Sequence, residues 1–170
     1  MRIKQLSSLD LISLGGAQIE DIPLWIRTIY GFLEISVITM FLTTWLNLGL
    51  TWKRKLVISL GVLFCVLSAR ILLQNLFFVT GAGVVSFYLL LFFLTRARGL
   101  KVIISILATY MVLIIVEPIT HLMSLKLLHE LDYLHIWLIS GFPNILVFIL
   151  LTYLLIKVRQ NNEKSEHKAL

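Results

Sequence analysis

The chain has 170 residues, of which 59% are hydrophobic and only 14% charged, and its mean hydropathy is +0.95. A soluble domain of this size could not bury so much apolar side chain, so the composition indicates an integral membrane protein. The formal charge of +6 is concentrated in short segments that flank apolar runs, and no continuous basic face with interleaved aromatics is present, which excludes nucleic acid as a partner.

The first apolar run covers residues 22–50 and follows a segment, residues 1–21, that we expect to be extracellular or interfacial. Pro23 suits the first turn of a helix. At about 29 residues the run exceeds one hydrocarbon thickness. Its opening, with Arg27 and Tyr30, is therefore expected at the level of the lipid headgroups.

Between Lys55 and Arg96 lie 40 residues with a single charge, Arg70. This stretch is too long for one span and is basic at both ends, so the pattern predicts a hairpin of two helices, residues 56–73 and 80–95.

The hairpin is expected to turn at Gln74 and Asn75, with a second break at the glycines of residues 81–83. A second helix of roughly 16 residues is shorter than the usual 20. The connection is therefore expected to lie below the membrane surface, close to Arg70, where irregular backbone must be buried in protein or line a wet cavity.

The fourth span is predicted at residues 102–124 and the fifth at 136–156, followed by a hydrophilic tail, residues 157–170. The polar connection between the two spans carries the set His129, Glu130, Asp132 and His135. These residue types can hold zinc or copper, but they are ordinary in a polar loop and lack the HExxH spacing. We therefore expect no metal site and no cofactor.

Orientation follows from the basic clusters, which must share one side of the membrane if the hairpin is correct. The positive-inside bias makes that side cytoplasmic. The predicted fold is an all-α bundle of five transmembrane helices in a bacterial cytoplasmic membrane, with the N-terminus outside and the tail inside. No motif for catalysis is present, so we expect no enzyme.

Three charged residues, Glu34, Arg70 and Glu117, interrupt segments that are otherwise almost wholly apolar. Counted by helical rise from the nearest basic cluster, they lie roughly 22–28 Å from the cytoplasmic face. Ionised groups at such depth are costly and are normally paired, hydrated or functional. The three charges therefore predict a polar layer in the outer half of the membrane, built from three different helices.

Two further helical segments contribute to the predicted layer. His121 follows Glu117 at i+4 and should share its face, and Asn144 lies at similar depth in the fifth span. Pro118 and Pro143 should kink their helices and free a backbone carbonyl in each. Together these features predict a concave, outward-facing site.

Three roles remain open for this layer. In the first, Arg70 forms a structural ion pair with Glu34, Glu117 or both. Alternatively the layer recognises a ligand, or a carboxylate couples to protons or cations. The first function considered is therefore a sensing or signal-relay module, and the second is a small transporter or transporter subunit.

Several segments resemble one known family in their order along the chain. They are WIRTIYGFLEISVITMFLTTWLNLGL, then KRKL, LFCVLSARILLQ, FYLLLFFLTRARGLK and YMVLIIVEPITHL. Over about residues 22–160 this order resembles the multi-span membrane input region of Firmicutes sensor histidine kinases of the accessory-gene-regulator and GHKL type.

The resemblance implies that the chain receives an extracellular signal, a peptide or a small molecule, and passes it through the last helix. Glu34, Arg70 and Glu117 would be among the characteristic polar positions. The chain ends 14 residues after residue 156, so we expect an input module without a kinase domain, acting through a cytoplasmic or membrane protein partner or as a homodimer.

Overall fold

The computed structural model describes residues 23–73, 75–127 and 133–169, and every regular element within these ranges is an α-helix. The helices are α2 (Leu24–Trp45), α3 (Trp52–Leu73), α4 (Leu76–Thr95), α5 (Leu100–Leu127) and α6 (Tyr133–Ala169). All five are long and apolar enough to cross a membrane. The chain thus has the structure of a multi-pass membrane protein, and five spans are what the composition predicts. Residues 1–22 lie outside the described ranges.

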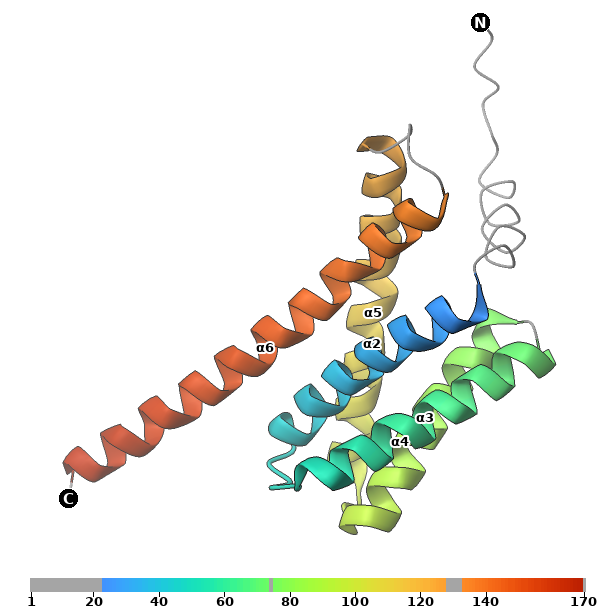
Figure 1. Cartoon of the computed structure of the whole chain (residues 1–170). Coiled ribbons are helices and arrows are strands. Elements are labelled where there is room, and N and C mark those ends of the chain that lie inside the picture. Colours follow the sequence, from blue (N-terminus) through green and yellow to red (C-terminus); the bar gives the residue numbers. More distant parts are fainter. Residues whose placement is uncertain (1–22, 74, 128–132, 170) are drawn as a thin grey trace, which may run out of the picture.

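Helix α2 lies at the centre of the bundle and contacts α3, α5 and α6. Helices α3 and α4 form the expected hairpin, while α6 runs along α2 and continues beyond the other helices towards the C-terminus (Figure 1). Helix α5 crosses behind α2 at a steep angle (Figure 1). Because each helix satisfies its own backbone hydrogen bonds, this arrangement suits a lipid environment.

Several helix bounds differ from the expected ones, and α6 continues as a helix to Ala169, through most of the predicted tail. Helix α2 ends at Trp45, and the chain turns through left-handed backbone at Asn47 and Gly49 before α3 begins at Trp52. Helix α4 begins at Leu76 and is 20 residues long, with the glycines of residues 81–83 inside it. Glycine is common in transmembrane helices, because the surrounding lipid offers the backbone no competing hydrogen bonds.

The start of α4 has its own local cause. The side chain of Asn75 accepts a hydrogen bond of 2.9 Å from the backbone N–H of Phe77, so Asn75 caps the helix. With the cap at residue 75, α4 has the length of a complete span. The described residues therefore contain no short helix of the kind we expected near Arg70.

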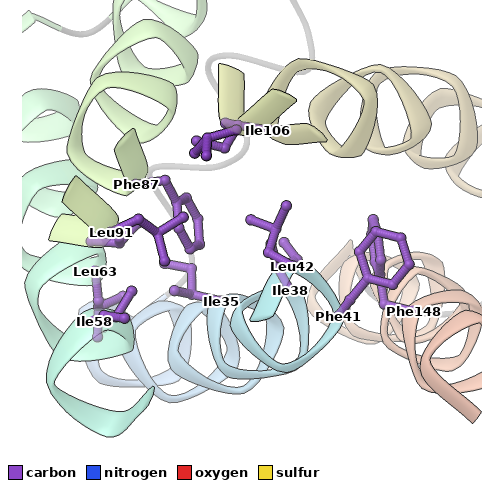
Figure 2. Packing of buried hydrophobic residues seen from close by; sticks show 12 residues of the cluster. Ile35, Ile38, Phe41, Leu42, Ile58, Leu63, Phe87, Leu91, Ile106 and Phe148 are labelled. Atoms are coloured by element: carbon purple, nitrogen blue, oxygen red, sulfur yellow. The ribbon is translucent and has the colours of Figure 1, made fainter. Parts of the chain in front are cut away.

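The apolar core lies in the half of the bundle between residue 34 and the α2–α3 turn. Figure 2 shows how side chains from five helices meet there. The buried cluster consists of Ile35, Ile38, Phe41, Leu42, Ile58, Val62, Leu63, Phe87, Leu91, Val102, Ile106 and Phe148. Phe41 and Phe148 join α2 to α6, with ring centroids 5.3 Å apart.

Small polar side chains share the buried interfaces, while many large apolar side chains are exposed on the outside. Thr39 on α2 is 1% exposed and accepts a hydrogen bond of 3.1 Å from the Ser59 hydroxyl on α3. Thr109, Thr152 and Ser105 each bond to a carbonyl in their own helix. Small or polar interfaces with an apolar exterior are typical of helix packing in membranes.

Candidate functional site

The centre of the site is a contact between α2 and α6. The Asn144 carboxamide donates a hydrogen bond from Nδ2 to Oε1 of Glu34, at 3.4 Å. Asn144 is only 2% exposed. The predicted layer residues Glu34 and Asn144, 110 positions apart in the chain, thus lie side by side in the bundle.

Arg70 and Glu117 belong to the same cluster. The Arg70 guanidinium is close enough to interact electrostatically with the carboxylates of both Glu34 and Glu117, and the two carboxylates also interact with each other. Within the described ranges, no direct ion pair joins Arg70 to either glutamate. The charge of the Arg70 guanidinium therefore lies near two carboxylates without direct contact. The sequence had suggested a direct ion pair with one or both of them.

The exposure of these charges is uneven. Glu34 and Arg70 are partly buried, whereas Glu117 is exposed on the surface of α5. An exposed carboxylate in the middle of an apolar span cannot face lipid cheaply. Its position is therefore suited to a hydrated opening, a ligand or a protein partner.

His121 joins the cluster through α6. Its Nδ1 lies 3.4 Å from the hydroxyl of Ser140, which is buried on the same helix as Asn144 and one turn before it. His121 therefore packs towards α6, while Glu117, one turn earlier in α5, remains exposed. We predicted that Glu117 and His121 share one face of α5. In the structure the two side chains differ in their surroundings, since His121 contacts α6 and Glu117 is exposed.

Two tyrosines missed by the sequence analysis complete the cluster. Tyr30 lies near Glu34 and Glu117, and Tyr110 lies near Glu34. Their hydroxyls end against helix backbone at glycines: Tyr30 against Gly141 of α6, and Tyr110 against Gly83 of α4. The sequence spacing could have indicated that Tyr30 belongs to the cluster, because Tyr30 lies one turn before Glu34, on the same face of α2. We had placed it at the headgroups instead.

Oδ1 of Asn144 is a buried atom of the cluster that has no hydrogen-bond partner within the described part of the chain, and the same holds for Nε of Arg27 elsewhere on α2. A buried acceptor without a donor costs about 1–3 kcal/mol. Unsatisfied buried polar atoms are rare in native folds, and one explanation for them is a functional role. The Asn144 carboxamide is thus available to accept a hydrogen bond from a donor that enters the cluster.

Pro118 and Pro143 lie inside α5 and α6, and both helices continue past them. Since proline has no N–H, Pro118 cannot bond the carbonyl of Ile114, nor can Pro143 bond that of Ile139. The kinks themselves remain a prediction.

The polar connection between α5 and α6 is described only in part. His129, Glu130 and Asp132 lie outside the described residues, and His135 is exposed. Across the described ranges, no group of three or more His, Cys, Asp or Glu side chains is arranged to hold a metal ion. Cys65 is exposed on α3.

A second polar contact joins the same two helices at the other end of the bundle. Nη1 of Arg159 on α6 donates to Oδ1 of Asn47 at 2.7 Å, and Nη2 donates to the carbonyl of Trp45 at 3.4 Å. Asn47 adopts left-handed backbone in the turn after α2, which asparagine tolerates better than most residues. The start of the tail is thereby held against the turn between α2 and α3.

Comparisons of the chain with family models, with curated proteins and with solved structures gave no match.

Proposed function

We propose that the chain is a membrane sensing module that relays a change in the polar cluster to its cytoplasmic tail, without catalysis of its own. The cluster comprises Glu34, Arg70, Glu117, His121 and Asn144, together with the two tyrosines. In this proposal the protein lies in a bacterial cytoplasmic membrane, with its N-terminus outside and the cluster in the outer half. It acts as the sensor-kinase input regions that it resembles do, through a protein partner.

The observation that carries the proposal is the double connection of α2 to α6. Glu34 meets Asn144 within the membrane, and Asn47 meets Arg159 at the basic end. Along the continuous helix α6 these two contacts lie about 22 Å apart. Because an α-helix is stiff over that length, a shift at Asn144 moves the segment after Arg159. The bundle therefore offers a mechanical path from cluster to tail.

The ligand in this proposal disturbs the charge balance of the cluster. Two carboxylates face one guanidinium without a direct pair, so a charged or hydrogen-bonding group of a peptide or small molecule has acceptors and a donor to meet. An exposed Glu117 provides the point of entry. A ligand shifts an equilibrium only by its different affinity for the two arrangements.

Tail mobility tests this relay. In a Cys65→Ser background, a spin label on Asn161→Cys, an exposed position beyond Arg159, reports the motion of the tail in proteoliposomes. Glu34→Gln keeps the size of the side chain but replaces a charge-assisted hydrogen bond by a weaker neutral one. We expect a clearly more mobile spectrum for Glu34→Gln, and a similar one for Arg159→Gln.

Ser59→Ala is the matched control, because it removes the hydrogen bond between α3 and α2 and leaves α6 untouched. Its label spectrum should equal that of the natural chain. If Glu34→Gln leaves the spectrum unchanged, or if Ser59→Ala alters it equally, the relay through α2 and α6 is wrong.

The second function, a transporter or transporter subunit, is favoured by a different observation. The cluster holds a surplus carboxylate next to the buried Oδ1 of Asn144, and oxygen acceptors of this kind suit a proton or a cation. The tail measurement separates the two functions, because transport does not require α6 to move the tail.

Orientation has its own test with a membrane-impermeant thiol reagent applied to intact cells. In the Cys65→Ser background, Glu117→Cys should be modified from outside, because residue 117 is exposed within the half of α5 that this orientation places in the outer leaflet. Lys101→Cys, exposed at the other end of the same helix, is the control and should react only after permeabilisation. The reverse pattern would invert the bundle, and no reaction of Glu117→Cys from either side would contradict a hydrated site.

A further inference from the structure

A shallow groove between α4 and α5 lies apart from the polar cluster. It is lined by Val84, Val85 and Tyr88 of α4 and by Ile103 and Ile106 of α5, and its volume is about 200 Å³. Every lining side chain is apolar or aromatic, and the groove opens on the outside of the bundle. In a membrane, such a groove faces the acyl chains of the lipids.

An aromatic ladder connects the groove to a positive charge. Tyr88, which lines the groove, stacks on Phe92 with ring centroids 6.4 Å apart and planes 27° apart. The guanidinium carbon of Arg98 lies 4.9 Å from the centroid of Phe92, within the range of a cation–π interaction. The charge of Arg98 is therefore held on the same side of α4 as the groove.

The loop after α4 keeps this charge at the end of the helix. Arg96 adopts left-handed backbone, with φ 54°, and its N–H bonds the carbonyl of Phe92, so the helix stops there. Gly99, with φ 98°, turns the chain into α5, where Lys101 is exposed in the first turn. Three exposed cations, Arg96, Arg98 and Lys101, thus lie in or directly after the loop that joins α4 to α5.

Negative charge is scarce on α4 and α5 within the described residues. Within residues 75–127 the one acidic side chain is Glu117, which lies 16 residues after Lys101 along α5. The basic group therefore has no carboxylate of α4 or α5 beside it. Basic pockets between transmembrane helices at the cytoplasmic side are suited to lipid phosphates.

The dimensions fit one leaflet. From Val84 to the end of α4 at Thr95 the helix rises about 17 Å. One leaflet contributes about half of a hydrocarbon core roughly 30 Å thick. An acyl chain that starts at the basic loop and follows the groove would thus end near the middle of the bilayer.

We propose that this groove binds an anionic phospholipid, with one acyl chain along Val84, Val85 and Ile103 and the phosphate against Arg98 and Lys101. The site is independent of the proposed sensing function. It couples the α4–α5 pair to the lipid composition of the leaflet that faces the basic loops.

Lipid titration followed by native mass spectrometry tests the headgroup contact. The detergent-solubilised full chain is titrated with phosphatidylglycerol and, separately, with phosphatidylcholine of the same acyl chains. One charge near the membrane surface changes affinity by about fivefold. Arg98→Gln with Lys101→Gln should therefore weaken phosphatidylglycerol binding about 25-fold, with little change for phosphatidylcholine.

The matched control is Lys53→Gln with Arg54→Gln, which removes two charges that are also exposed, at the start of α3. It should weaken binding much less, because no groove accompanies these charges. Equal losses from the two double variants would overturn the proposal and assign the binding to general surface charge. Equal affinity of the natural chain for the two lipids would overturn it as well.

A second pair of variants tests the acyl-chain contact. Val85→Trp fills the groove from a position that is 57% exposed, so the fold has room for it. Val57→Trp, 50% exposed on α3, is its control. Val85→Trp should weaken the binding of both lipids several-fold and Val57→Trp should not. An unchanged affinity for Val85→Trp would show that the groove holds no acyl chain.

Discussion

Replacing Asn144 by leucine should destabilise the folded bundle by up to about 3 kcal/mol, although leucine is apolar and close in volume. Asn144 is buried, and its Nδ2 is the hydrogen-bond donor to the Glu34 carboxylate. Leucine leaves that carboxylate desolvated without its donor, beside a second carboxylate on α5. The loss of stability therefore arises from the Glu34 carboxylate that remains without a donor, and not from the removal of the Asn144 side chain itself.

The double variant Glu34→Leu with Asn144→Leu should recover most of this stability. Replacing a buried polar pair by well-packed apolar side chains is often neutral or stabilising. The substitution also removes the surplus carboxylate, so that Arg70 faces Glu117 alone. A stable double variant would show that the bundle does not need the pair in order to fold.

Unfolding by SDS in mixed micelles, followed by circular dichroism, gives the four free energies of this double-mutant cycle. Thr152→Val is the control on α6, because Thr152 is also buried but bonds the carbonyl of Phe148 in its own helix. Its cost should stay near 1 kcal/mol. If the double variant is as unstable as Asn144→Leu, the cluster is structural.

Gly83→Ala should destabilise the bundle by about 1–3 kcal/mol through overpacking. A Cβ built at residue 83 lies 3.0 Å from Cζ of Tyr110 and closer still to its hydroxyl oxygen. The Tyr110 ring is wedged between α4 and α5 and packs edge-on against Phe87, with centroids 6.3 Å apart. It has little freedom to move away, so the two helices must separate or the ring must leave the cluster.

Gly81→Ala is the control that the chain itself offers. Gly81 is exposed in the same helix, and no atom lies within 4 Å of a Cβ placed there. Alanine is the better helix former, so this substitution should be neutral or stabilising by up to about 1 kcal/mol. The same unfolding measurement compares the two. Equal effects of both substitutions would mean that Tyr110 does not pack against Gly83.

Combining Gly83→Ala with Tyr110→Phe tests the contact directly. Phenylalanine removes the hydroxyl that the new Cβ would meet first, so part of the lost stability should return. Gly141 and Tyr30 form the equivalent contact between α6 and α2. In both cases a glycine admits a tyrosine that belongs to the polar cluster, which explains why a small residue is needed at these positions.

The five spans, their order, the hairpin of α3 and α4 and the three charges within apolar runs could all be predicted from the sequence. These features are local, because hydrophobic length, basic flanks and a charge within an apolar run are all visible in a single segment. The start of α4 was expected at residue 80, after the predicted breaks, but the helix begins at Leu76. Glycines that end helices in water are tolerated inside a membrane helix.

The lateral order of the helices was decided only in the tertiary structure. Period and hydropathy do not reveal that Glu34 on α2 meets Asn144 on α6, or that Arg70 interacts with two carboxylates without touching either. Such contacts depend on which helix faces lie together, and those faces are chosen by close packing of residues such as Gly83 and Gly141. Hydropathy alone cannot choose among these faces, because lipid solvates an apolar face as well as a neighbouring helix does.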